Sequence, residues 1–189
     1  VADEETGSRY GLSYMLKHHG DIFSPEDLII VPDAGNEDGT MIEIAEKSML
    51  WLKFTINGRQ CHASTPHKGK NSLVGAARLI VALGKLKEKF AASNPLFSPP
   101  VSTFEPTKFL ANVSNVNTIP GKETFYMDCR ILPEHNVDEV IETAQQIVSS
   151  VAAELELHME LESEHRHDAP LPTPATAPVV AALKKAVMN

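Results

Sequence analysis

Short apolar blocks separated by polar stretches mark the first 47 residues of the chain. The pattern predicts a helix over residues 10–16, with Ser8 at its N-terminus. The apolar run over residues 28–31, Leu-Ile-Ile-Val, is bounded by polar residues, which is typical of a strand buried on both faces of a parallel sheet. Strands and a helix in such close succession predict an α/β unit.

A different pattern begins near Met49. Residues 50–56 are typical of a strand, and the strand ends at Asn57-Gly58, a strong turn signal. From about residue 72 to residue 90, apolar residues recur near the 3.6-residue period of a helix. Residues 94–100 contain three prolines, which predict a loop.

The second half of this region repeats the same kinds of element. Strand-like runs at 102–113 and 123–131 are joined through 117–121, a helical period covers 138–155, and alternation over 155–161 predicts a closing strand. The order is β-α-β-β-α-β, the ferredoxin-like split unit, with two helices expected on one face of the sheet. Its uncovered edge could pair with another chain.

The composition changes again near the C-terminus. Residues 168–178 contain four prolines and predict a linker, and Pro178 suits the first turn of a final helix. We therefore expect an α/β portion over 1–47, an α+β domain over 48–163, and a return linker with the start of a helix over 164–189. The chain opens on Val1 and its last helix has little to pack on, so we expect an internal piece of a longer protein.

Composition and charge exclude several classes of partner. The net charge is -8, with 25 acidic and 17 basic residues and no block of Lys or Arg, so we expect no nucleic-acid binding. No apolar run is long enough to span a bilayer, and the charged opening is unlike a signal peptide. The two cysteines predict free thiols in a reducing compartment, and we expect a cytoplasmic protein.

Two acidic segments are candidates for chemistry. Glu4 and Glu5 are adjacent carboxylates before a helix start, and a metal ion would offset their repulsion. Their structural alternative is an acidic loop that suits the helix dipole. Asp33 follows the predicted strand 28–31, at the strand end where ligands sit in α/β sheets, although an Asp there is also a common turn residue.

Two further candidates lie in the α+β domain. His62 and His67 are five residues apart with small polar residues between them, and could bind a metal or polarise a carbonyl; a surface loop is the alternative. Asn117, at a turn, and Arg130, on the following strand, could hold an oxyanion and a carboxylate. Alternatively, Asn117 only forms the turn and Arg130 only pairs with a neighbouring acid.

The order and spacing of four segments resemble metallopeptidase family twenty. The segments are Ala-Asp-Glu-Glu-Thr-Gly-Ser (2–8), Pro-Asp-Ala-Gly (32–35), Cys-His-Ala-Ser-Thr-Pro-His-Lys-Gly-Lys-Asn (61–71) and Asn-Thr-Ile-Pro-Gly (117–121). The family includes succinyl-diaminopimelate desuccinylase, acetylornithine deacetylase, aminoacylase and glutamate-releasing carboxypeptidase. The resemblance covers essentially the whole chain and implies a homodimeric hydrolase of N-acyl amino acids or peptides, with residues 48–163 as a lid domain inserted in a catalytic domain.

The resemblance also implies roles for individual residues in a centre of two zinc (or cobalt or manganese) ions. Glu4 matches the general base, and Glu5 and Asp33 match one ligand for each metal ion. His62 matches the lid histidine that stabilises the oxyanion in the partner subunit's site. Asn117 matches an assisting asparagine, and Arg130 matches the arginine that holds a substrate carboxylate.

This chain departs from the family in its other metal ligands. The upstream His-x-Asp segment and the distal histidine are absent, so only two of the five usual ligands are here, and the site in this chain is incomplete. A free-standing dimerisation module without catalysis is therefore the competing interpretation. A regulatory domain that senses an amino acid is disfavoured, because residues 1–47 would then have no role.

The incomplete ligand set makes a first prediction. The purified 189-residue chain, supplied with zinc, should not hydrolyse N-acyl amino acids, because two ligands do not hold a tight dinuclear centre. The measurement is release of free amino acid over time. Robust turnover would contradict the prediction, whereas partial metal occupancy at Glu5 and Asp33 would not.

Overall fold

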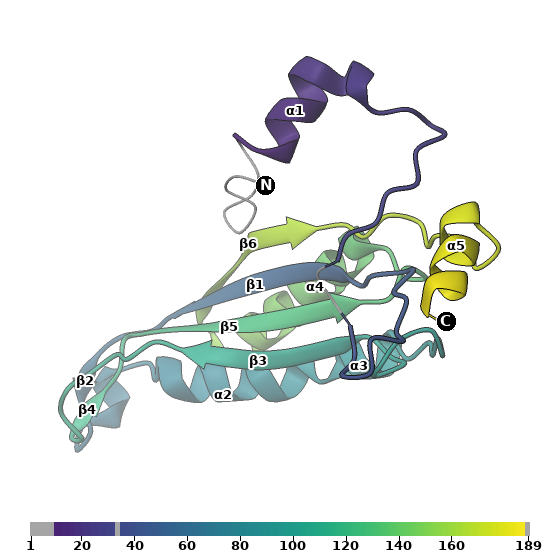
Figure 1. Cartoon of the computed structure of the whole chain (residues 1–189). Coiled ribbons are helices and arrows are strands. Elements are labelled where there is room, and N and C mark those ends of the chain that lie inside the picture. Colours follow the sequence, from purple (N-terminus) through teal and green to yellow (C-terminus); the bar gives the residue numbers. More distant parts are fainter. Residues whose placement is uncertain (1–9, 33–34, 188–189) are drawn as a thin grey trace. The chain divides into compact units, whose positions relative to one another are not determined.

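The computed structural model describes residues 10–32 and 35–187, and the chain divides into two compact units (Figure 1). The larger unit is residues 44–173 and the smaller unit is residues 1–43 together with 174–189. The chain therefore leaves the smaller unit, forms the larger one, and returns.

The larger unit carries the long elements in the order β-α-β-β-α-β that the sequence predicts, with short elements between them. Its elements are β1 Ser48–Asn57, β2 Cys61–His62, η3 Pro66–Lys68, α2 Ser72–Leu83, α3 Lys85–Lys89, β3 Thr103–Phe109, β4 Thr118–Ile119, β5 Lys122–Ile131, α4 Val137–Leu155 and β6 His158–His167.

Four strands form one sheet in the order β3-β5-β1-β6, and every neighbouring pair is antiparallel. Helices α2 and α4 lie together on one face of this sheet (Figure 1). Along β1 the residues Leu50, Leu52, Phe54 and Ile56 are fully buried, whereas Trp51 between them is 43% exposed. This period-two burial places one face of the sheet against the helices and leaves the other face open.

Local sequence explains where the two long helices begin. The side-chain oxygen of Asn71 accepts hydrogen bonds from the backbone N–H groups of Leu73 (3.0 Å) and Val74 (3.3 Å), which caps α2. Asn136 caps α4 by accepting from the N–H of Asp138 at 2.7 Å. Both asparagines immediately precede the apolar period, so these helix starts are readable in the sequence.

The structure corrects two boundaries in this unit. The helix predicted over 72–90 is divided at Gly84, whose N–H donates to the carbonyl of Val81 (3.2 Å), three residues earlier. The closing strand, predicted to end at residue 161, continues to His167 because Met49 of β1 pairs with His167 of β6. The sequence 165–167 therefore belongs to the sheet and is not the solvated linker that its His-Arg-His composition suggests.

The smaller unit contains α1 Leu12–His19, η2 Gly20–Ile22 and α5 Pro178–Val187, which confirms the helices predicted near residues 10–16 and from Pro178. The strand predicted over 28–31 is not formed, and its side chains are exposed, Val31 by 75%. A strand needs a neighbour for its backbone hydrogen bonds, and no described residue of this unit is in a strand. In the described part of the chain, no helix is long and apolar enough to cross a bilayer.

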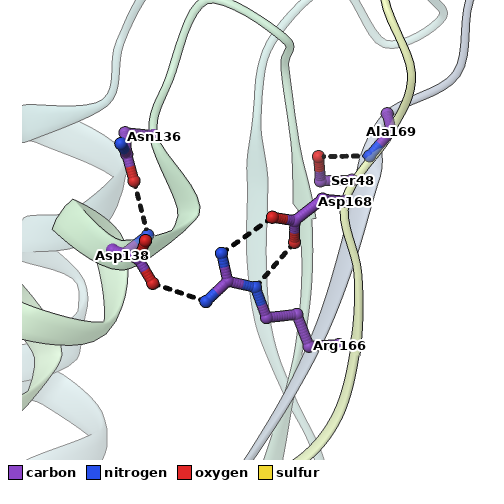
Figure 2. Close-up of polar contacts among 6 residues, drawn as sticks. All are labelled: Ser48, Asn136, Asp138, Arg166, Asp168 and Ala169. Carbon is purple, nitrogen blue, oxygen red and sulfur yellow. Dashed lines mark hydrogen bonds and ion pairs between the residues drawn. The ribbon is translucent and has the colours of Figure 1, made fainter.

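A polar network joins β6 to the start of α4 (Figure 2). Arg166 donates from Nε and Nη2 to both carboxylate oxygens of Asp168, each at 2.7 Å, and from Nη1 to Asp138. The two hydrogen bonds from Arg166 to Asp168 lower the pKa of the Asp168 carboxyl. The contact therefore stabilises the fold above the unfolded-state pKa of an aspartate and is lost as the pH falls through the lowered pKa. Beside it, Ser48 Oγ accepts from the N–H of Ala169 (2.9 Å), joining the entering and leaving segments.

The core makes a second prediction. Phe54 is fully buried and its ring stacks on Phe125 with centroids 4.7 Å apart. Phe54→Ala should lower the free energy of unfolding by about 3–5 kcal/mol, because the new cavity and the lost burial of the ring both destabilise the folded state. Urea unfolding followed by circular dichroism measures the change.

The matched control is Leu171→Ala, since Leu171 is 92% exposed. This control should change the free energy of unfolding by less than about 0.5 kcal/mol. Equal losses for the two variants would contradict the assignment of the core.

Candidate functional site

Of the residues that the sequence singles out, Glu4, Glu5, Ser8 and Asp33 lie outside the described residues. His62, Asn117 and Arg130 lie inside them, all in the larger unit. The structure therefore shows which of these three residues lie close to one another.

His62 and Asn117 meet at one end of the larger unit, where β2 and β4 form a separate two-stranded ladder (Figure 1). We call residues 57–71 together with 115–121 the tip. Within the tip, His62 pairs with Thr118, and the N–H of Ala63 donates to the carbonyl of Asn117 at 2.8 Å. These backbone contacts bring together two segments that are far apart in sequence.

Two glycines allow the tip to close. A Cβ on Gly58 would lie 2.2 Å from the carbonyl oxygen of Lys70, and a Cβ on Gly69 would lie 2.5 Å from Cys61 Sγ. The N–H of Gly58 also donates to the carbonyl of Gly121 at 2.8 Å, which ties the end of β1 to the start of β5. Side chains at either position would push the backbone segments apart.

The exposed imidazole of His62 has polar neighbours at both ring nitrogens. Its Nδ1 lies 2.7 Å from Ser64 Oγ and 3.1 Å from the backbone nitrogen of Ser64. Its Nε2 lies 3.3 Å from Nδ2 of Asn117. The structure therefore pairs the two tip residues that the sequence singled out, and it adds Ser64 of the same motif, whose contact with His62 has no signal in the sequence.

Arg130 lies near the other end of β5, facing the open side of the sheet. It donates from Nε (2.9 Å) and Nη2 (3.1 Å) to the two oxygens of Asp128. Trp51 donates its indole N–H to Asp128 at 2.8 Å, and its ring lies 5.1 Å from that of His165. The structure shows the pairing with a neighbouring acid that the sequence offered as the structural role of Arg130, and that acid is Asp128, two residues earlier on the same strand.

The tip and Arg130 are far apart within one chain. β5 begins at Lys122, beside the tip, and Arg130 is eight residues further along the same strand. At about 3.4 Å per residue this is roughly 27 Å, far beyond the reach of the side chains. One chain therefore does not bring Arg130 together with His62 and Asn117.

Comparison with known proteins identifies the chain. The sequence model of a protein family described as the peptidase dimerisation domain matches residues 44–156. The chain belongs to metallopeptidase family twenty. The resemblance that four short segments predicted is thereby confirmed.

The curated relatives of this family-twenty chain are considerably longer than it is. A metallohydrolase from Methanococcus maripaludis is 48% identical over 158 residues, which cover 82% of this chain and 38% of the relative. A metallohydrolase from Methanocaldococcus jannaschii is 47% identical, with 79% of this chain and 37% of the relative covered. Succinyl-diaminopimelate desuccinylase from Polynucleobacter necessarius is 27% identical, with 82% and 40% covered. The chain thus spans about two fifths of these relatives' length.

Solved structures share the fold at lower identity. An amidase of the hydantoinase/carbamoylase family from Burkholderia ambifaria is 20% identical with a TM-score of 0.58, covering 67% of this chain and 29% of that protein. An amidase of the same family from Burkholderia multivorans is also 20% identical with a TM-score of 0.57, covering 77% and 33%. These matches support the fold of the family-twenty chain.

Metal ligands are not grouped in the described part of the family-twenty chain. No cluster of three or more His, Cys, Asp or Glu side chains that could hold a metal ion occurs among residues 10–32 and 35–187. The two histidines of the tip belong to no such cluster. His62 contacts Ser64 and Asn117, and His67 lies in η3. The expected ligands Glu5 and Asp33 are outside the described residues.

A pocket of about 340 Å³ lies at the edge of the tip and is lined by residues of the tip, of the segment before β4 and of the start of β5. The lining residues are Gln60, Leu110, Ala111, Asn112, Val113, Gly121, Lys122 and Thr124. Next to it in sequence, Glu123 is buried and contacts Asn112, and burial raises the pKa of Glu123.

The two cysteines make a third prediction. Cys61 is half-buried beside His62, whereas Cys129 is fully buried and burial raises the pKa of its thiol to about 12. Iodoacetamide should therefore modify Cys61 of the native protein quickly and Cys129 slowly, because the thiolate is the reactive form. Mass spectrometry of tryptic peptides identifies the modified site.

Two further measurements distinguish the reactivity of Cys61 from that of Cys129. Cys61→Ser should abolish the rapid labelling, and unfolding in urea should expose Cys129 as a second reactive site. Rapid labelling of Cys129 in the native protein would contradict the packing of β5 against the helices.

Proposed function

We propose that the intact protein is a zinc-dependent amidohydrolase that cleaves the amide bond of N-acyl amino acids or peptides through a metal-activated water. The observation that carries the proposal is the His62–Asn117 pair, held at an exposed tip with 3.3 Å between Nε2 and Nδ2. Two side chains able to donate hydrogen bonds at one point suit a tetrahedral oxyanion. Family membership and the names of the relatives, metallohydrolase and desuccinylase, support the reaction class.

We assign residues 48–163 to a ferredoxin-like lid domain and residues 1–47 and 164–189 to a catalytic domain. The sheet order β3-β5-β1-β6, with two helices on one face, supports the first assignment. The exposed apolar run over residues 28–31 supports the second, because it suits a strand inside a larger parallel sheet. The greater length of the relatives is consistent with such a sheet.

In the catalytic domain we assign Glu4 as the general base and Glu5 and Asp33 as metal ligands. Two bound zinc ions would polarise the scissile carbonyl and lower the pKa of the attacking water. Glu4 accepts the proton of that water and passes it to the departing nitrogen. The assignments follow from the match of these residues to the family's motifs.

In the lid we assign His62 and Asn117 to the oxyanion and Arg130 to a substrate carboxylate. Asp128 occupies Nε and Nη2 of Arg130, so we assign Nη1 to the substrate. A charge-assisted hydrogen bond from a guanidinium N–H favours a carboxylate over a neutral group. Trp51, bound to the same Asp128, holds that acid in place.

The separation of roughly 27 Å between the tip and Arg130 supports a site shared between two subunits. In a two-fold dimer the tip of one lid reaches toward the partner's catalytic domain, so His62 acts in trans. The sheet edge at β3 is our proposed contact, because β3 carries one glutamate, Glu105, whereas the opposite edge strand, β6, carries three, Glu160, Glu162 and Glu164. Exposed valines on α2, Val74 (53%) and Val81 (79%), add apolar surface.

A complementation experiment on the full-length protein tests function and arrangement together. Glu4→Gln and His62→Asn variants should each lose at least about 100-fold in kcat toward an N-acyl amino acid, since each removes a group that acts in the transition state. Mixed in equal amounts and allowed to exchange subunits, they should recover about one quarter of wild-type activity, because half of the dimers carry one intact site of two.

The controls decide which proposal fails. Absence of wild-type turnover against a panel of N-acyl amino acids and dipeptides would overturn the amidohydrolase and favour the binding module. Wild-type turnover without recovery in verified mixed dimers would place His62 in the site of its own chain.

A further inference from the structure

The contacts of His62 determine which of its ring nitrogens carries the proton. A backbone N–H can only donate a hydrogen bond, and that of Ser64 points at Nδ1 from 3.1 Å. Nδ1 must therefore be the bare, accepting nitrogen, and the proton of the neutral ring lies on Nε2. The hydroxyl of Ser64, 2.7 Å from the same Nδ1, donates to it as well.

A tight turn places Ser64 beside Nδ1 of the ring. The N–H of Thr65 donates to the carbonyl of His62 at 3.0 Å, and the hydroxyl of Thr65 reaches the same carbonyl at 3.3 Å. This turn aims the intervening N–H of Ser64 back at the imidazole, so the contact follows from the backbone and not only from a mobile side chain.

We propose that Ser64 is a positioning residue that holds His62 in the Nε2–H tautomer, so that a neutral imidazole offers one N–H to an anionic oxygen. This inference rests on the proposed function for its role in catalysis, but the tautomer itself follows from the tip alone. In the opposite tautomer, two donors would meet at Nδ1 and Nε2 would have no proton to give to the oxyanion.

The same reasoning assigns two orientations to the Asn117 amide. With Nδ2 facing Nε2 at 3.3 Å, two N–H donors lie side by side, and an anionic oxygen that accepts from both satisfies them. Without such an oxygen, the amide turned over presents Oδ1, which accepts from Nε2–H. Asn117 therefore holds the donor of His62 in the resting tip and joins it when substrate binds.

Nitrogen NMR of the ¹⁵N-labelled 189-residue chain tests the tautomer without any need for activity. At mildly alkaline pH, where imidazole is neutral, Nε2 of His62 should carry the proton and Nδ1 should not. A scalar coupling across the hydrogen bond between the Ser64 amide nitrogen and Nδ1 is also expected. A proton on Nδ1 would overturn the proposal.

Kinetics of the full-length enzyme test the role. Ser64→Ala should lower kcat about 3- to 10-fold with KM nearly unchanged, as expected for loss of one hydrogen bond that orients the ring. Ser64→Thr, which keeps the hydroxyl, should restore kcat, and Ser149→Ala on the exposed face of α4 is the matched control. Wild-type kcat in Ser64→Ala would remove the hydroxyl from the proposal.

An acidic variant tests the amide. Asn117→Asp can only accept from Nε2–H, so it should keep the tautomer in the NMR spectrum yet lower kcat at least about 10-fold by leaving one donor fewer for the oxyanion. Asn115→Asp, two residues away, makes the same change of charge and should leave kcat within about 2-fold of wild type. Equal losses in the two variants would show an effect of charge alone and would overturn the role given to the amide.

Discussion

The pairing of β1 with both β5 and β6 is the constraint on which the larger unit depends. The strand is bonded on each side, and alternate residues from Leu50 to Ile56 are fully buried against the two helices. Since side chains alternate along a strand, the same pairing decides that Trp51 faces the open side. A slip of β1 by one residue would exchange the two faces of this strand, burying Trp51 and Lys53.

The tip depends on the ends of those same strands. β1 leaves the sheet at Asn57, β5 begins at Lys122, and the bond between Gly58 and Gly121 fixes the distance between them. The short ladder of β2 and β4 lies next to this hydrogen bond in the chain. The backbone that carries the exposed His62 is held by two hydrogen bonds, from Thr65 N–H to the carbonyl of His62 and from Ala63 N–H to the carbonyl of Asn117.

The arrangement gives the open sheet face and the tip different tasks in the proposed enzyme. Arg130 and Asp128 lie on regular strand, where neighbouring strands hold them, and His62 lies at the far end of the unit. A chemistry that needs both groups is satisfied by two chains and not by one. The proposed dimer therefore completes a site as well as burying an edge strand.

The sequence by itself determined the order of the long elements and the family, because local period and short motifs carry that information. It also singled out His62 and Asn117, but not their contact. Only the tertiary structure decided that β6 continues to His167, that 28–31 forms no strand, and that Ser64 sets the tautomer of His62. Each of these depends on which backbone segment becomes a neighbour, and hydrogen bonds between distant segments leave no period in the sequence.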